Sequence, residues 1–125
     1  MRIEHAALFV ADLEGARDFF IRYFGARAGE LYCNRENGFR SYFLSFDGGA
    51  RLELMQKPDL AVGAGEALGW SHVAFSLGSR TAVDELTARL QKDGYTVVSG
   101  PRTTGDGYYE SCVEVFGGQR IELTI

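Results

Sequence analysis

Residues 48–54, GGARLEL, recur as residues 117–123, GGQRIEL, at an offset of 69 positions, and five of the seven residues are identical. A second pair of segments supports this repeat, because residues 4–8, EHAAL, align with residues 71–75, SHVAF, at an offset of 67. Nearly equal offsets at both ends of each half indicate a duplicated module. We therefore expect the same fold to be built twice in one chain.

Each half of the chain has the pattern of one strand, one helix and three further strands. In the first half, Asp12 is positioned to cap a helix that Gly25 ends. In the second half, Ser79 is the expected cap of a helix over about 80–92, with a stop at Gly94. The expected strands lie near residues 3–10, 28–34, 38–46 and 50–56, and near 70–77, 95–98, 108–116 and 119–125.

The domain organisation follows from this pattern. Two βαβββ modules, residues 1–56 and 70–125, flank a linker over 57–69 that is rich in Gly and Ala and contains Pro58. A length of 125 residues suits one compact domain. We expect a single α+β domain over residues 1–125.

The composition restricts the class of protein. With 46% hydrophobic and 24% charged residues, the chain is typical of a packed globular protein. The net charge of −4 and the lack of a Lys or Arg cluster argue against nucleic acid as a partner. We expect no membrane association, because no apolar stretch approaches the roughly 20 residues of a span and no leader pattern opens the chain. The two cysteines, Cys33 and Cys112, form no CxxC motif and favour a reduced, cytoplasmic setting.

The repeat places both histidines and two glutamates at equivalent strand positions. His5 and His72 lie in the first strand of their modules, and Glu53 and Glu122 lie in the last. Because side chains alternate along a strand, the bulky aliphatic neighbours face the helices and these four side chains face the other way. A carboxylate in an apolar strand is costly unless it is paired or binds a metal.

Two interpretations of these residues compete. Taken singly, a strand histidine is commonly a hydrogen-bonded core residue, and Arg51 and Arg120 share the faces of the two glutamates and could pair with them. Taken together, two imidazoles and two carboxylates suit one divalent ion such as Zn, Ni, Co, Mn or Fe(II). Octahedral coordination would leave two positions open for water or substrate. One repeat arranging all four residues favours the metal site.

The order His5, Glu53, His72, Glu122 resembles the metal set of the vicinal oxygen chelate superfamily. Its members include glyoxalase I, methylmalonyl-CoA epimerase, extradiol dioxygenases, fosfomycin-resistance enzymes and bleomycin-binding proteins. The resemblance covers nearly the whole chain and is strongest at residues 5–13, 71–75 and 120–123. It implies that paired βαβββ modules form a partly closed mixed β-barrel, with all four residues as ligands of one metal per site.

The resemblance also implies an activity. Retention of both glutamates favours a metal-dependent lyase or isomerase similar to glyoxalase I (lactoylglutathione lyase), which chelates a small α-oxygenated substrate and forms an enediolate. Glu122 is then the candidate catalytic base and Glu53 the alternative. The other functions left open are an epimerase, a dioxygenase, an antibiotic-modifying thiol transferase, or a metal-free bleomycin-type binding protein.

Departures from the glyoxalase pattern concern the substrate. Phe9 stands where glutathione-binding glyoxalases tend to carry Arg, and Lys57 stands where they tend to carry Asn. Residues 99–110 hold three glycines and a proline, so we expect a loop there, which is either a candidate lid or an ordinary solvated loop. The candidate substrate-binding residues are Phe9, Trp70, Arg102, Tyr108 and Tyr109.

The expected assembly is a symmetric homodimer. In small bacterial glyoxalases each site takes one His and one Glu from each of two subunits, and the resemblance implies the same sharing here. If the two modules of one chain lie side by side, apolar strand edges and the concave face stay exposed, which a monomer should not tolerate. A two-fold interface would cover both and create two equivalent sites.

Overall fold

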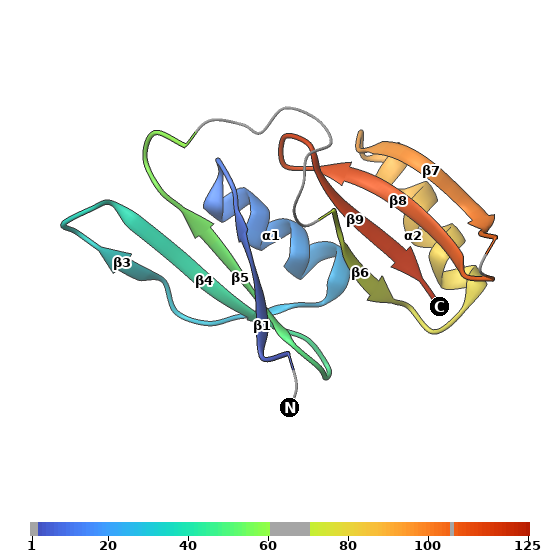
Figure 1. Ribbon diagram of the computed structural model, residues 1–125, viewed down its shortest axis with the longest axis horizontal. Helices are drawn as coiled ribbons and strands as arrows, with labels where there is room; N and C mark the ends of the chain where they lie inside the picture. Colours follow the sequence, from blue (N-terminus) through green and yellow to red (C-terminus); the bar gives the residue numbers. More distant parts are fainter. Residues whose placement is uncertain (1–2, 61–70, 106) are drawn as a thin grey trace. The chain divides into compact units, whose positions relative to one another are not determined.

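The computed structural model describes residues 3–60, 71–105 and 107–125 (Figure 1). The chain divides into two compact units, Met1–Ala61 and Val62–Ile125, which we call unit 1 and unit 2. Each unit holds one helix and one mixed sheet, so the predicted α+β class is confirmed. Most of the expected linker and the candidate residue Trp70 lie outside the described residues.

Unit 1 has a sheet with the strand order β1-β5-β4-β2, and β3 also pairs with β4. β1 runs parallel to β5, and the other pairs are antiparallel. The strand expected near 28–34 is in fact two short strands, which residues 29–31 separate. The elements are β1 (His5–Phe9), α1 (Leu13–Phe24), β2 (Arg27–Ala28), β3 (Tyr32–Asn34), β4 (Phe39–Ser45) and β5 (Arg51–Gln56).

Unit 2 repeats the central part of this topology. Its sheet order is β6-β9-β8-β7, with β6 parallel to β9 and the other pairs antiparallel. In both units the first strand therefore lies beside the last, which is what a duplicated βαβββ module requires. The elements are β6 (Val73–Ser76), α2 (Arg80–Lys92), β7 (Thr96–Thr103), β8 (Tyr109–Val115) and β9 (Gln119–Thr124).

The prediction of a loop over residues 99–110 is wrong for most of that range. β7 continues to Thr103 and β8 begins at Tyr109, so much of the candidate lid is a β-hairpin. β7 is an edge strand with two register shifts, where glycine and proline are tolerated. A Cβ on Gly100 would lie 2.4 Å from the carbonyl oxygen of Glu110, so this glycine permits close strand pairing.

Both helices begin where the sequence predicts. A carboxylate oxygen of Asp12 accepts a hydrogen bond from the Gly15 amide at 3.0 Å, and the Ser79 hydroxyl accepts one from the Ala82 amide at 3.2 Å. Gly25 ends α1 with a φ of 62°, in the left-handed region that glycine adopts without strain. The N-caps therefore fix how each chain segment enters its helix.

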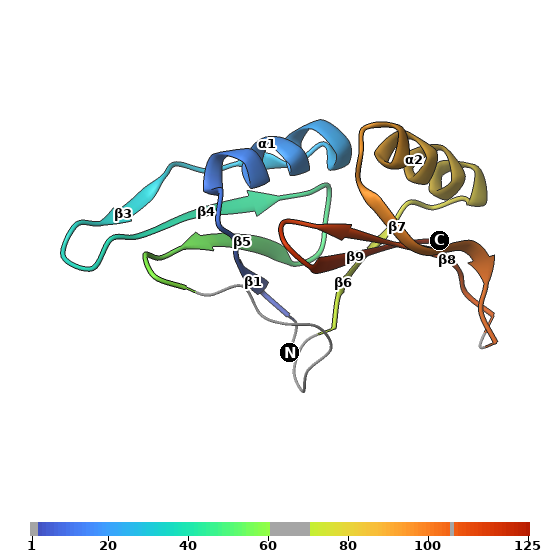
Figure 2. The ribbon, with the colours of Figure 1, turned by 90° about the horizontal axis from the view of Figure 1, so that it is seen from above.

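Each helix covers one side of the sheet in its own unit (Figure 2). Because buried leucines, valines and isoleucines alternate along the strands beneath, the intervening residues project from the other side. That alternation turns His5, Glu53 and Glu122 away from the helices. The core includes Leu13, Phe20, Leu44, Leu52 and Leu54 in unit 1, and Val83, Leu90, Val113, Ile121 and Leu123 in unit 2.

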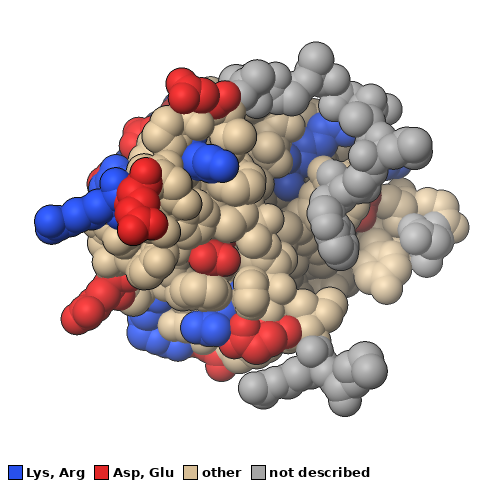
Figure 3. Space-filling model, turned by 60° about the vertical axis from the view of Figure 1, so that its left-hand side comes forward, with Lys and Arg blue, Asp and Glu red and all other residues tan. Residues whose placement is uncertain are grey.

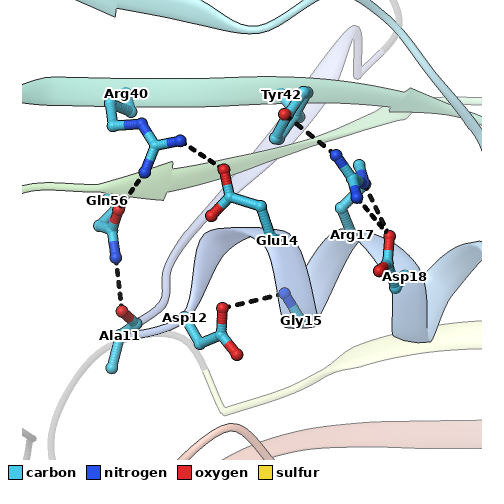
Figure 4. Close-up of polar contacts among 9 residues, drawn as sticks. All are labelled: Ala11, Asp12, Glu14, Gly15, Arg17, Asp18, Arg40, Tyr42 and Gln56. Atoms are coloured by element: carbon cyan, nitrogen blue, oxygen red, sulfur yellow. Dashed lines mark hydrogen bonds and ion pairs between the residues drawn. The ribbon is translucent and has the colours of Figure 1, made fainter.

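Polar contacts also join helix and sheet. In unit 1, Arg17 donates to the Tyr42 hydroxyl at 3.1 Å, and Arg40 pairs with Glu14 (Figure 4). In unit 2 the corresponding space holds a buried hydrogen bond of 2.6 Å between the hydroxyls of Thr87 and Ser111. These contacts fix the helix side of each sheet and leave the opposite side for a site.

Candidate metal centre

Unit 1 brings His5 and Glu53 together. The parallel pairing of β1 and β5 sets Ala7 against Glu53, so His5 reaches the carboxylate from the start of the neighbouring strand. His5 Nε2 lies 3.9 Å from Glu53 Oε2. The side chains are 39% and 16% exposed, respectively. The imidazole is thus open to solvent, while the carboxylate is largely shielded.

Unit 2 brings His72 and Glu122 together in the same way. His72 directly precedes β6, and Glu122 pairs with Ala74 in the parallel ladder. His72 Nε2 lies 3.4 Å from Glu122 Oε2, with side chains 40% and 17% exposed. The two pairs therefore match in atoms and in exposure, and the two glutamates also match in strand position.

The chemistry of each pair suits part of a metal site. Within the described ranges, no group of three or more His, Cys, Asp or Glu side chains lies close enough to hold a metal ion. Each pair supplies one imidazole nitrogen and one carboxylate oxygen, which are ligand types that borderline divalent ions accept. Two ligands are fewer than the three or four protein ligands of a typical catalytic zinc site. Neither pair is by itself a complete ligand set.

The competing interpretation of Arg51 as the partner of Glu53 is not supported. The Arg51 guanidinium pairs instead with Glu4, through Nε at 2.8 Å and Nη2 at 2.5 Å from Oε1. It also lies over the Phe43 ring, with 4.2 Å between the guanidinium carbon and the ring centroid. The His5 imidazole, and not the Arg51 guanidinium, therefore lies beside the Glu53 carboxylate on the sheet face.

Glu4 also contacts His5 itself. Glu4 Oε2 lies 2.5 Å from His5 Nδ1, on the ring edge opposite the nitrogen that faces Glu53. The hydrogen bond with His5, followed by the contacts with Arg51, lowers the pKa of Glu4 below its ordinary value. The two carboxylate oxygens of Glu4 thus face a guanidinium and an imidazole.

The surroundings of the second pair are different. Ser71 Oγ lies 3.3 Å from His72 Nδ1, at the position that Glu4 occupies in unit 1. Cys112 lies opposite Glu122 on the neighbouring strand, where Phe43 lies opposite Glu53. Burial raises the pKa of the Cys112 thiol, and the charge of Glu122 adds to that effect. Cys112 is therefore a neutral thiol at physiological pH.

The predicted substrate-binding residues lie in different places. Phe9 is 44% exposed and shares the face of His5, two strand positions beyond Ala7. Tyr108 is exposed, and Arg102 lies 3.9 Å from the carboxylate of Glu110. The Tyr109 hydroxyl donates to Asp84 of α2 at 2.5 Å, so this side chain lies on the helix side of its sheet. Tyr109 is thus separated by the sheet from the face of Glu122.

Sequence reasoning missed Glu4. Its neighbour His5 was identified, but adjacency to a candidate ligand says little, since successive strand residues point to opposite faces. Glu4 precedes β1, so this alternation does not govern its side chain. The contact with Arg51, 47 positions away, depends on the parallel register of β1 and β5.

The surface charge is mixed. On the face drawn in Figure 3, Lys and Arg side chains alternate with Asp and Glu, and the described residues there form no large patch of one sign. Neither helix in the described part of the chain has the length and hydropathy of a membrane span.

The paired modules and their matched His–Glu pairs agree with a comparison of the whole sequence. Residues 2–123 match the family model of the Glyoxalase/Bleomycin resistance protein/Dioxygenase superfamily, and the chain belongs to this superfamily. The resemblance inferred from the motifs is therefore confirmed at the level of the superfamily. No curated protein sequence matches the chain.

Solved structures are similar over nearly the full length. A possible glyoxalase from Bacillus cereus is 29% identical with a TM-score of 0.72, covering 100% of this chain and 99% of that one. Glyoxalase I of Leishmania major, described as trypanothione-dependent, is 20% identical with a TM-score of 0.79, covering 99% and 86%. A glyoxylase/bleomycin resistance protein/dioxygenase domain from Frankia sp. EAN1pec is 16% identical with a TM-score of 0.83, covering 100% and 97%. The last two likenesses show the fold alone.

Proposed function

We propose that this protein is a metal-dependent lyase or isomerase similar to glyoxalase I, acting on a small α-oxygenated substrate. One observation carries the proposal. Each unit holds a His Nε2 beside a Glu carboxylate at equivalent positions, at 3.9 Å in unit 1 and 3.4 Å in unit 2. Membership of a superfamily that contains glyoxalases supports it.

The four residues His5, Glu53, His72 and Glu122 would hold one divalent ion, such as Ni, Zn, Co, Mn or Fe. Such an ion, when bound, polarises adjacent substrate oxygens and stabilises the negative charge that develops on them. Because each carboxylate is mostly shielded from solvent, it would exchange its ligand role for a proton-transfer role without competition from bulk water. The solvent-exposed imidazoles would stay as fixed ligands.

Glu122 is the proposed base, with Glu53 as the alternative. The carboxylate would remove a proton from the carbon beside the substrate carbonyl and return it to the neighbouring carbon. The electron pair of the broken C–H bond forms a C=C bond while the carbonyl π pair moves onto its oxygen. When the neighbouring carbon is protonated, the C=C pair becomes the new C–H bond. A carbonyl then re-forms on the first carbon, and the hydroxyl proton passes from its oxygen to the other oxygen. The proton is conserved, so the isomerisation needs no oxidant, reductant or second substrate.

The substrate end of the proposal rests on Phe9. This ring is exposed on the face of His5, where an apolar group of a substrate would pack against it. An arginine there would instead grip a carboxylate, as the glutathione-binding pattern implies. The proposed substrate is therefore a small α-oxygenated compound that need not carry glutathione.

The proposed assembly is a homodimer with sites shared between subunits, located in the cytoplasm. Each unit supplies half of the ligand set, so a site needs two units that face each other. Such units can come from one chain or from two. The two free cysteines, Cys33 and Cys112, fit a reducing compartment.

Elemental analysis tests the metal site. Protein purified without chelator should carry about one divalent ion per chain, and His72→Ala should lose most of it. Glu85→Gln on the exposed face of α2 is the matched control and should retain the metal. Equal metal content in wild type and His72→Ala would overturn the proposal.

Turnover then tests the reaction class. The metal-loaded protein is assayed against a panel of α-ketoaldehyde adducts of different thiols and against the free α-ketoaldehydes. Isomerisation of at least one member supports the proposal. A loaded protein that turns over none of them would instead favour another enzyme of the superfamily.

A further inference from the structure

We propose that Glu4 is a positioning residue that fixes the ring of His5 with its proton on Nδ1, which leaves Nε2 free to bind the metal. The inference deepens the proposed function and rests on it for the metal. Its central claim concerns a hydrogen bond within unit 1 and is testable in the metal-free protein.

The Glu4 carboxylate uses its two oxygens separately. Oε2 lies 2.5 Å from His5 Nδ1, while Oε1 accepts from Arg51 Nε at 2.8 Å. The backbone adds a third tie, because the Arg51 amide donates to the Glu4 carbonyl oxygen at 2.9 Å. Glu4 is thus held by Arg51 in the position from which it contacts His5.

An ionised carboxylate can only accept hydrogen bonds, so it selects the tautomer of its partner. His5 Nδ1 must therefore carry the proton that it shares with Glu4. In the neutral ring, Nε2 then keeps its lone pair. Glu53 Oε2 lies 3.9 Å from Nε2, beyond hydrogen-bond distance, so the 2.5 Å contact with Glu4 decides which nitrogen carries the proton. A carboxylate behind a ligating imidazole also raises the basicity of the ligating nitrogen.

Phe43 restrains the same ring from another side. The His5 and Phe43 rings meet edge to face, with centroids 5.2 Å apart and an interplanar angle of 85°. Phe43 also contacts the Arg51 guanidinium, whose carbon lies 4.2 Å from the ring centroid. Glu4 and Phe43 therefore each contact His5, and Arg51 contacts both Glu4 and Phe43.

Unit 2 lacks this arrangement at the matching position. Ser71 lies 3.3 Å from His72 Nδ1, and a hydroxyl can either donate or accept. Ser71 therefore leaves the tautomer of His72 undetermined, whereas Glu4 determines that of His5. The two histidines should differ in tautomer control although their glutamates are equivalent.

The first test is the tautomeric state in metal-free, ¹⁵N-labelled protein. The chain has two histidines, so a long-range ¹H–¹⁵N spectrum holds two ring systems, and His72→Ala assigns them. At mildly alkaline pH we expect His5 as the Nδ1–H tautomer in wild type and in Ser71→Ala. Glu4→Gln should lose it, because the amide has one acceptor oxygen for two donors and its NH₂ group then faces Nδ1.

The isosteric Glu4→Gln change separates this role from a structural one, since packing is preserved and circular dichroism should be unchanged. Finding His5 as Nε2–H in wild type would overturn the inference. So would an unchanged Nδ1–H pattern in Glu4→Gln.

The second test is zinc affinity, measured by competition with a chromophoric chelator. Glu4→Gln should bind zinc about 10- to 100-fold more weakly than wild type, the usual effect of removing such a partner. Ser71→Ala should show a smaller loss. Glu36→Gln, which removes one exposed charge away from His5, is the control and should match wild type.

The outcomes separate the two proposals. If wild type binds no zinc, the proposed function fails, and the spectrum alone decides the role of Glu4. If wild type binds zinc and Glu4→Gln binds it as tightly as Glu36→Gln does, the role of Glu4 fails and the metal site stands.

Discussion

Units 1 and 2 build the same His–Glu pair on the same kind of sheet but surround it with different side chains. Glu4 contacts the histidine of unit 1, and Ser71 takes that place in unit 2. Phe43 lies opposite the glutamate of unit 1, and Cys112 lies opposite that of unit 2. The parallel first and last strands fix the pair, so the neighbours are free to diverge.

The helix sides of the two sheets differ in the same manner. In unit 1, Arg17 reaches Tyr42 in a half-exposed contact. In unit 2, Thr87 and Ser111 form a hydrogen bond inside the core and satisfy each other there. The duplicated backbone thus tolerates a charged hydrogen bond near the surface in one unit and a neutral buried one in the other. The topology therefore constrains the positions of the candidate ligands more strongly than it constrains the helix–sheet packing.

The largest effect on turnover is expected from removing the histidine of either unit. His5→Ala and His72→Ala should each lose nearly all metal-dependent turnover, because each deletes a ligand from every site. In a shared-site dimer, mixing the two variants joins the intact His5 of one chain with the intact His72 of the other. Random exchange should then restore about a quarter of the wild-type activity.

Sedimentation of the protein gives its oligomeric state and so tests the same shared-site arrangement. Free exchange of subunits without any return of activity would break the shared-site arrangement, and so would a monomer at micromolar concentration. The two units would then have to complete the site within one chain.

The next largest effect should separate the two glutamates. Glu122→Gln should lower kcat by about 10²-fold or more, the scale of a lost general base, while Glu53→Gln should lower it less. Metal content is measured in both, since the role of the base is assessed only where the metal is retained. Glu85→Gln on α2 is the control. A larger loss of kcat in Glu53→Gln would identify Glu53, in unit 1, as the base.

Truncation of a buried leucine should destabilise the cores of the two units to a similar extent. Leu54 and Leu123 are fully buried at matching positions of the last strands. Truncation of either to alanine should lower the free energy of unfolding by about 2–5 kcal/mol, from lost burial and the cavity left behind. Chemical denaturation measures both, with exposed Leu31→Ala expected to change stability by only about 0.5 kcal/mol. A loss below about 1 kcal/mol at one site would show that the cores are not equivalent.

The helices and the His–Glu pairs were predictable because their signals are local or repeated. Asp12, Gly25 and Ser79 each act within one turn of their helix, so their effect does not depend on the rest of the fold. The parity of His5 and Glu53 follows from the alternation of strand residues. The shared face of each pair needed no knowledge of strand order, whereas the contact within each pair depends on the first strand lying beside the last.

The misassigned features depend on pairing across the sheet. Gly100 and Pro101 are typical of a loop, yet they lie in β7 because an edge strand tolerates its two register shifts. The role of Glu4 depends on Arg51, and the buried pairing of Thr87 depends on Ser111. Each partner is distant in sequence. The register of β1 and β5 brings Glu4 to Arg51, and the packing of α2 on its sheet brings Thr87 to Ser111.

The smallest expected effect compares the two N-caps. Asp12→Ala and Ser79→Ala should each cost about 1 kcal/mol of unfolding free energy, because each leaves a helix amide without its side-chain acceptor. Asp12 should cost somewhat more, since its negative charge also interacts favourably with the positive end of the α1 dipole.

Asp12→Asn isolates that charge. The amide oxygen keeps the hydrogen bond to Gly15 that the carboxylate makes at 3.0 Å, so only the dipole interaction is removed. The loss should be about 0.3–1 kcal/mol at low salt and should shrink as salt screens the charge. Ser79→Ala, which removes no charge, should show the same loss at both salt concentrations. A salt-independent loss in Asp12→Asn would mean that the two caps work by hydrogen bonding alone, and the difference between the units would disappear at this position.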